Sequence, residues 1–172
     1  VSDNTTPAIP IEERSELGRK LGREFVFSVE VNPGAGLATE KQLSAAKMLI
    51  NAGADVINIA DGPRATVRMS NLALATVMQN QLNIETILHV CCRDRNLLGQ
   101  QAFLLGAHVL GIRNLVLITG DPPKVGDYPD ATAVYDQDSL GLISMAHGYN
   151  HAVDLAGKAM REQTQFILAT GV

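Results

Sequence analysis

Two acidic residues stand near the ends of apolar stretches of this sequence, where a carboxyl group could transfer a proton. Glu30 lies near the end of the stretch Phe25–Val31, and Asp121 follows the stretch Asn114–Thr119. In a parallel β/α fold the ends of all strands meet on one face, and that face carries the chemistry. We therefore expect the two carboxyl groups to converge on a common cavity.

Two further apolar stretches, Asp55–Ala60 and Glu85–Cys91, also carry polar residues at their ends. The first is followed by Asp61, and the second contains His89 and runs into the pair Cys91-Cys92. A lone histidine in a strand is most often a satisfied core residue. Adjacent strand residues point to opposite faces, so we interpret the two cysteines as packing residues rather than a redox pair.

These four stretches begin at intervals of roughly 30 residues, which is the length of one βα unit. A fifth stretch, Phe166–Ala169, follows after a longer, irregular interval. The pattern predicts an α/β fold built as a TIM (β/α)8 barrel. A closed barrel needs at least ~200 residues, so we expect this chain to hold only the N-terminal half, with about five strands.

Apolar residues at helical spacing predict helices between the strands. After Asn96, the spacing of Leu98, Ala102, Leu105 and Val109 predicts a helix with these residues on its buried side. The other predicted helices are Ile11–Gly22, a helix capped by Thr39 that ends at Gly53, Ser70–Leu82 and Ser139–His147.

The first of these helices divides the chain into two expected segments. Residues 1–22 are expected to be a helix or linker, which could cap the base of a barrel, and residues 23–172 to be the barrel part itself. No stretch reaches the ~18 apolar residues that a membrane span needs, and residues 1–10 lack the apolar core of a signal peptide.

Composition favours a globular cytoplasmic protein. Of the 172 residues 46% are hydrophobic, and the net charge of −4 gives no sign of the basic patch that a nucleic-acid partner needs. The two cysteines form no disulfide framework, and no further Cys or His stands at metal-ligand spacing. We therefore expect no nucleic acid, membrane or metal among its partners.

The strand-end motifs together resemble the methylenetetrahydrofolate reductase family. The motifs are Ser28–Pro33, Asn58–Pro63, His89–Asn96 and Ile118–Pro123, and the likeness extends over about residues 23–172. The tract Thr119–Pro129 is most similar to the subgroup in which the reductase is fused behind a homocysteine S-methyltransferase domain. The resemblance implies a TIM-barrel flavoprotein with FAD, NAD(P)H and a folate substrate, acting in one-carbon and methionine metabolism.

The resemblance also implies roles for individual residues. Glu30 corresponds to the general acid that opens the folate ring, which requires a carboxyl group kept protonated in a desolvated barrel mouth. Asp121 corresponds to a residue that tunes the flavin and orients the folate. The implied cofactor contacts are Ala60, Asp61, Pro63, His89, Thr119, Gly120, Asp121, Tyr135 and Asp136. The chain departs from the family at Thr119, where many members have arginine, and at Ala60, where threonine is frequent.

Purely structural interpretations of the same residues stay open. Glu30 could pair with a cation such as Arg93, and Gly-Asp-Pro at Asp121 could be an ordinary turn. Asp136 and Asp138 could be acids in the first turn of a helix. The run Arg93-Asp94-Arg95 could be a solvated cluster of ion pairs in a loop.

Two other functions compete with a reductase. The stretch Ala54–Ile59 is similar to a strand of barrels that bind a pterin without flavin and either transfer methyl groups to cobalamin or make dihydropteroate. The chain could also be a non-catalytic half-barrel that serves in an assembly. In the family, FAD contacts come largely from strands five to eight, so this piece is expected to hold FAD poorly. Its open strand edges would favour a homo-oligomer, or cover by other parts of a longer chain.

Overall fold

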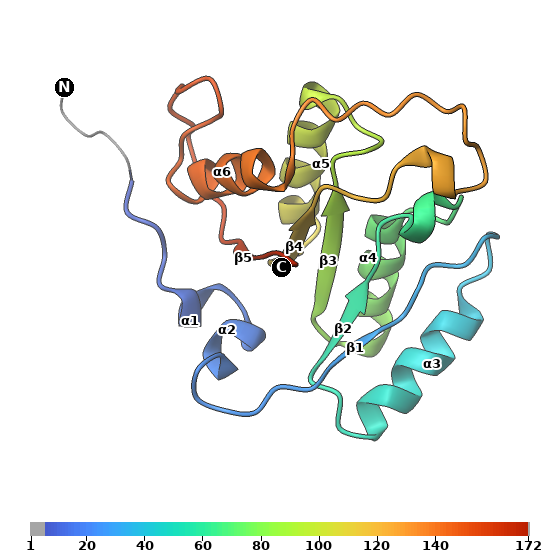
Figure 1. Ribbon diagram of the computed structural model, residues 1–172. Helices are drawn as coiled ribbons and strands as arrows, with labels where there is room; N and C mark the ends of the chain where they lie inside the picture. Colours follow the sequence, from blue (N-terminus) through green and yellow to red (C-terminus); the bar gives the residue numbers. More distant parts are fainter. Residues whose placement is uncertain (1–5, 172) are drawn as a thin grey trace.

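A computed structural model describes residues 6–171, which form one parallel sheet with helices packed along one side (Figure 1). The five strands follow one another across the sheet in chain order, and each neighbouring pair is parallel. A parallel sheet in consecutive order is the arrangement of a (β/α)8 barrel wall, so the predicted fold class is confirmed. The strands are β1 (Ser28–Glu30), β2 (Val56–Ile59), β3 (Thr86–Cys91), β4 (Asn114–Ile118) and β5 (Ile167–Ala169).

The outer strand β1 is shorter than the apolar stretch that predicted it. Phe25 and Phe27 lie outside the strand and are exposed. The pairing with β2 begins at Ser28, opposite Val56. The Phe27 carbonyl still accepts a hydrogen bond from the Asp55 N–H at 2.9 Å, so the chain runs beside β2 before the paired residues begin.

Each gap between strands contains one α-helix, as the repeat predicted. Asn96 caps its helix by accepting a hydrogen bond from the Gly99 N–H, and Gly53 (φ 100°) takes the left-handed conformation that ends a helix. Thr39 is the N-cap residue of its helix, as predicted, but its side chain accepts no hydrogen bond from the helix. None of the helices within residues 6–171 is long and apolar enough to span a membrane. The helices are α3 (Glu40–Asn51), α4 (Asn71–Leu82), α5 (Leu97–Val109) and α6 (Ser139–Asn150), with 3-10 turns η1 (Pro63–Ala65) and η2 (Pro123–Val125).

The predicted buried side of α5 is wrong. Leu98 and Val109 are 76% and 84% exposed, whereas Leu104 and Ala107 are fully buried. This helix is apolar on more than one side, so spacing alone offers two stripes of similar quality. Contact with the sheet selects between them.

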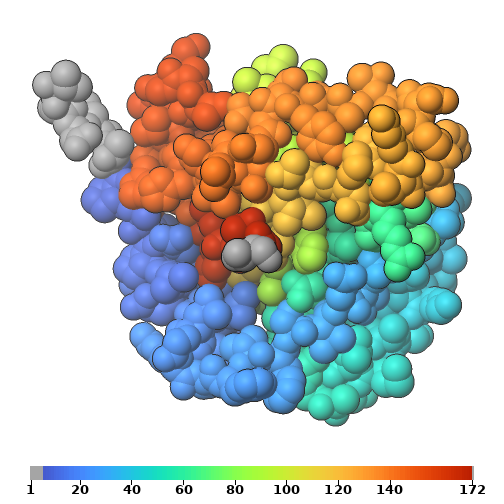
Figure 2. Space-filling model, viewed as in Figure 1, coloured from blue at the N-terminus to red at the C-terminus, as the bar shows by residue number. Residues whose placement is uncertain are grey.

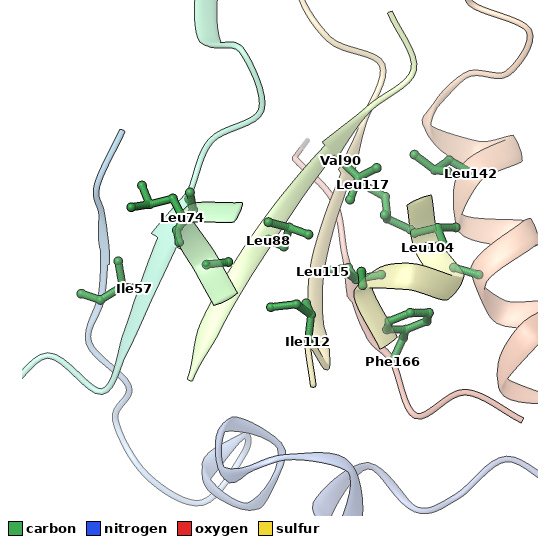
Figure 3. Packing of buried hydrophobic residues seen from close by; sticks show 14 of the residues in the cluster. Ile57, Leu74, Leu88, Val90, Leu104, Ile112, Leu115, Leu117, Leu142 and Phe166 are labelled. Atoms are coloured by element: carbon green, nitrogen blue, oxygen red, sulfur yellow. The ribbon is translucent and has the colours of Figure 1, made fainter. Parts of the chain in front are cut away.

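The hydrophobic core lies between the sheet and these helices (Figure 3). Strand residues such as Leu88 and Leu115 meet Leu74 of α4, Leu104 of α5 and Leu142 of α6. Full burial of a leucine side chain contributes about 1.5–3 kcal/mol. Alternate residues of the strands therefore pack against the helices, and the residues between them face the other side of the sheet.

The N-terminal segment forms two short helices, α1 (Ile11–Arg14) and α2 (Glu16–Lys20), instead of the single helix predicted. Ser15 interrupts the helix with an extended backbone, and its hydroxyl accepts a hydrogen bond from the Gly18 N–H. The Glu85 carboxylate, just before β3, accepts hydrogen bonds from the Glu16 and Leu17 N–H groups at 2.6 and 2.9 Å. The segment therefore packs at the base of the strands, at the end opposite the strand tips (Figure 1).

The predicted division at residue 22 stays a prediction, and residues 1–5 and 172 of the two segments lie outside the described residues. Figure 2 shows the segment near the C-terminus, coloured red, at the centre of the visible face. The N-terminal segment lies below it in blue, and the loop after β4 crosses above it in orange.

Candidate functional site

The strand register puts several predicted site residues on the side of the sheet that the helices do not cover. Glu30 is in register with Asn58, and His89 with Val116. Side chains alternate along a strand, and the intervening residues Leu88 and Leu115 belong to the core. Glu30, Asn58, His89 and Val116 therefore face the concave side, where the last three are half-buried.

His89 is held as a neutral imidazole on this side. Burial lowers the pKa of its ring, and the negative charges of Glu30 and Asp61 act in the opposite direction. Its backbone carbonyl accepts a hydrogen bond from Asn71 Nδ2 at 2.7 Å, which links β3 to α4.

Glu30, the last residue of β1, is exposed, and within residues 6–171 its carboxylate has no hydrogen-bond or ion-pair partner. The alternative in which it pairs with Arg93 is wrong, because that guanidinium binds Asp94 instead. The desolvated mouth expected around this carboxyl is not formed by the described residues. Glu30 is therefore available to a ligand on the concave side.

Asp61 is held by an ion pair at the end of β2. Its carboxylate accepts hydrogen bonds from Arg95 Nη1 at 2.8 Å and from the Cys91 N–H at 3.0 Å. The Arg95 guanidinium also lies over the Phe103 ring, 3.9 Å from its centre. These contacts tie the end of β2 to β3 and to α5, so Asp61 has a structural task in addition to any contact with a ligand.

Asp121, after β4, points toward the loop that follows β2. Its carboxylate accepts a hydrogen bond from the Arg64 N–H at 2.8 Å. Arg64 and Ala65 both have left-handed backbones, with φ of 57° and 54°. Such residues cost about 1–3 kcal/mol each unless the surroundings hold them, and this hydrogen bond is one such restraint. The turn at Asp121 therefore also restrains the loop that follows β2. That Glu30 and Asp121 converge on one cavity stays a prediction.

Arg93 is the central link between the strand ends. Its side chain is only 5% exposed, and its guanidinium donates to both oxygens of Asp94 at 2.8 Å. It also donates to the carbonyls of Gly62 (3.2 Å) and Asp121 (3.1 Å). The expectation of a solvated loop cluster is wrong for this residue. The ends of β2, β3 and β4 meet at one buried guanidinium, a role that sequence reasoning missed.

A cavity of about 480 Å³ adjoins the end of β4 and contains three of the predicted contacts. Their polar groups already have partners in the protein. Asp136 accepts a hydrogen bond from the Leu97 N–H at 2.8 Å, so it caps α5 rather than the helix that follows it. Asp138 caps α6 through the Gly141 N–H at 2.8 Å, which confirms its helix-terminus interpretation. The cavity is lined by Thr119, Tyr135, Asp136, Gln137 and Asp138.

The remaining predicted contacts are small or backbone groups. Ala60 is 5% exposed, and Gly120 has φ 92° with room for no side chain, since a Cβ would lie 2.9 Å from the Cys91 Cβ. The Tyr135 hydroxyl donates to the Gly120 and Asp121 carbonyls at 3.2 and 3.1 Å. Ala60 is therefore a small buried residue, and the side of Gly120 that a Cβ would occupy is filled by Cys91. Pro63 lies in η1, beside the left-handed pair.

The two cysteines are unreactive packing residues in the folded chain. Both are buried, and burial raises the pKa of the Cys91 thiol to about 12 and that of Cys92 to about 11. Cys92 belongs to the core, whereas Cys91 takes the opposite side of the strand. Within the described residues, no group of three or more His, Cys, Asp or Glu side chains is placed to hold a metal ion.

In a comparison with known protein families, the family model described as Methylenetetrahydrofolate reductase matches residues 17–157, most of the chain. The matched region begins within α2 and contains each predicted site residue from Glu30 to Asp136.

Proposed function

Because the chain belongs to the methylenetetrahydrofolate reductase family, we propose that it reduces 5,10-methylenetetrahydrofolate to 5-methyltetrahydrofolate with NAD(P)H and FAD. The family match supports an oxidoreductase acting on this folate. The observation that carries the finer proposal is the placement of Glu30 and His89 on the concave side of a parallel sheet, with Asp121 at the same strand ends.

FAD is the cofactor of this proposal. The cavity lined by Thr119, Tyr135 and Asp136 at the end of β4 would accept part of it. When bound, FAD supplies hydride transfer between the nicotinamide and the folate. Since the polar groups of the cavity already have protein partners, they would contact the cofactor through their remaining lone pairs and through the backbone.

Glu30 is the proton donor in the proposed reaction. An exposed carboxyl group without an internal partner can approach the five-membered ring of the folate and donate a proton that opens it to an iminium. His89 lies on the same side of the sheet and is neutral, so it adds no positive charge there.

Asp121 is the positioning group of the proposal. The Arg64 N–H fixes one of its carboxylate oxygens, and the Arg93 guanidinium and the Tyr135 hydroxyl hold its carbonyl. A carboxylate anchored in this way can orient a folate and place negative charge beside the cofactor. The tract Thr119–Pro129 supports a place near the bifunctional methyltransferase–reductase subgroup, with a cytoplasmic role in one-carbon and methionine metabolism.

The test separates the acid step from flavin reduction. Glu30→Gln should abolish reduction of the methylene folate, because an amide cannot donate the proton, and should leave menadione reduction by NAD(P)H with added FAD unchanged. Glu40→Gln, an exposed acid in the first turn of α3, is the matched control and should leave both reactions intact. Loss of both reactions in Glu30→Gln, or of neither, would contradict the acid role.

Two other outcomes would replace the proposed function. A purified chain that binds folate, shows no flavin absorbance and gains no reductase activity when FAD is added would favour the pterin-binding transferase. A chain that binds neither and reduces neither acceptor would favour the non-catalytic assembly subunit.

A further inference from the structure

Two histidines stand four residues apart at the end of α6. His147 lies in the last turn of the helix and is exposed, and His151 is the C-cap residue and is half-buried. Residues four apart lie on the same face of a helix. The two rings are neighbours, with centroids 4.5 Å apart and planes tilted by 57°. The expectation of no metal rested on the surroundings of the two cysteines and did not take this pair into account.

The distance between the two rings suits a shared metal ion. An imidazole nitrogen binds zinc at about 2.0–2.1 Å, so two rings on one ion have centroids roughly 4.5–5.3 Å apart for the usual angles between ligands. The observed separation of 4.5 Å falls in this range. Paired histidines at positions i and i+4 of one helix are also the arrangement by which metalloproteases hold zinc. The helix therefore already brings His147 and His151 within reach of one ion.

A hydrogen bond to the N-terminal segment fixes the tautomer of one ring. His151 Nδ1 lies 3.0 Å from the Thr6 carbonyl oxygen. A carbonyl oxygen can only accept, so Nδ1 carries the hydrogen, and Nε2 of the neutral ring keeps its lone pair. Metal-binding histidines characteristically donate their second ring N–H to such a carbonyl. His151 is therefore held in the tautomer that a metal ion at Nε2 requires.

The cavity beside the two rings suits a cation. It has a volume of about 420 Å³, and among the described residues its wall contains the Asp154 side chain but no lysine or arginine. Asp154 Oδ1 accepts a hydrogen bond from the Lys158 N–H at 2.7 Å, and within residues 6–171 this carboxylate belongs to no ion pair. The wall therefore carries an unneutralised negative charge, which attracts a cation and repels an anion.

We propose that His147 and His151 bind one divalent transition-metal ion of the zinc, nickel or copper class. Neutral imidazole is a ligand that these ions share, whereas Mg²⁺ and Ca²⁺ prefer oxygen. Within the described residues no group of three or more ligand side chains is placed around an ion. The two rings would therefore supply two ligands, and water would complete the coordination.

The proposed metal site lies apart from the strand ends. The Ser139 N–H, at the start of α6, donates to Thr119 Oγ1 beside the end of β4. His147 lies roughly 12 Å further along the helix axis, from a rise of about 1.5 Å per residue. An ion at this end would join the last turn of α6 to His151 and, through its hydrogen bond, to Thr6. The site goes beyond the proposed reaction and does not depend on it.

Isothermal titration of the untagged 172-residue chain with ZnCl₂, and separately with NiCl₂, tests the pair. Each ion should bind at one saturable site. His147→Gln and His151→Gln should each weaken zinc binding by about tenfold or more, since even partners outside the ligand shell contribute that much. Leu140→Gln is the control, at a residue of α6 that is 72% exposed and does not line the cavity, and it should bind zinc like the unmodified chain.

NMR locates the ion without any variant. Copper in less than equimolar amount should broaden the amide signals of Gly148 and Val153, which line the cavity, before those of Gly34 in the loop after β1. Circular dichroism checks that each variant is folded, and His147→Gln, at an exposed side chain, decides the outcome if His151→Gln is not. Unchanged zinc affinity in His147→Gln, an equal loss in Leu140→Gln, or no saturable binding of either ion would overturn the proposal. None of these results would affect the folate assay of Glu30.

Discussion

Charged residues at the strand ends divide into two groups by their partners. Arg93, Asp61 and Arg95 are largely buried, and they form ion pairs and hydrogen bonds with residues at the ends of neighbouring strands. Their charges therefore stabilise the loops. Glu30 and Arg64 have no charged partner among the described residues, so their charges are free to act on a ligand. The paired group builds the rigid edge from which the unpaired group acts.

Arg93→Met tests the first group. The substitution keeps much of the side-chain volume but leaves the Gly62 carbonyl without its side-chain donor and Asp94 without its cation, and it removes one of the two donors to the Asp121 carbonyl. We expect the free energy of unfolding to fall by about 2–4 kcal/mol, because buried groups without partners are costly. Urea denaturation measures the change. Arg19→Met, at an exposed ion pair in α2, should change stability by less than about 0.5 kcal/mol; an equal effect of the two substitutions would contradict this account of Arg93.

At the scale of elements, His108 joins the end of α5 to the start of β5. Its Nε2 accepts a hydrogen bond from the Gln165 N–H at 3.1 Å, and its ring packs edge-on against Phe166 with centroids 5.4 Å apart. Burial, with a smaller effect from the charge of Arg113, lowers the pKa of His108 to about 4. The ring must therefore be neutral in the folded chain, since only a neutral nitrogen can accept this hydrogen bond.

This neutral histidine predicts a loss of stability in acid. The unfolded state takes up a proton near pH 6.5, whereas the folded state does so near the lowered pKa of about 4. Stability is therefore complete above about pH 6.5 and falls as the pH drops toward 4, by on the order of 1–2 kcal/mol after allowance for solvent screening. Urea denaturation from pH 7.5 to 4.5 should show this slope, with His89 adding in the same direction. His108→Gln should reduce the pH dependence of the free energy of unfolding, whereas His147→Gln, at an exposed side chain, should leave it unchanged. An unchanged pH dependence in His108→Gln would contradict the role assigned to His108.

The elements that the sequence predicted well are those determined by local pattern. The apolar runs of β2 to β4, the Asn96 cap and Gly53 at the end of α3 need no distant partner to be recognised. The break at Ser15 was not predicted, because it depends on Glu85, 68 residues away from Leu17, accepting the first N–H groups of α2. The buried stripe of α5 was misassigned for the same reason, since the sheet selects it.

Local pattern likewise predicted one part of the candidate site and missed another. Regular spacing of βα units was enough to place Glu30, His89 and Asp121 at one edge of the sheet. Side-chain partners could not be predicted, because they depend on loop conformations between strands. The sequence leaves a solvated cluster open for Arg93, whereas contacts with the loops after β2 and β4 bury it. The left-handed backbone at Arg64 falls on a residue that is not glycine, so the sequence gives no sign of it.

At the scale of the whole molecule, the sheet is open at both sides within residues 6–171. β1 pairs only with β2, and β5 pairs only with β4, so each presents an unpaired row of backbone groups. Half-buried apolar residues such as Ile87 and Val116 also remain on the concave side. An open sheet edge, on a sheet whose concave side is incompletely covered, is a template for pairing with another chain. We propose that the isolated chain self-associates through these edges, or is covered there by other parts of a longer chain.

Phe27→Lys tests this proposal at the edge of β1. Phe27 is 59% exposed, and its backbone is already held, since its N–H donates to Asp55 and its carbonyl accepts from the Asp55 N–H. A lysine would keep these contacts and place a charge beside the free edge, a device that natural edge strands use against pairing. Leu37→Lys makes the same kind of change at a loop residue that is 98% exposed and lies outside every strand. Sedimentation velocity over a range of concentrations should show association of the unmodified chain and of Leu37→Lys, and mainly monomer for Phe27→Lys. If all three chains stayed monomeric, or all three associated equally, the exposed edge of β1 would not be the contact.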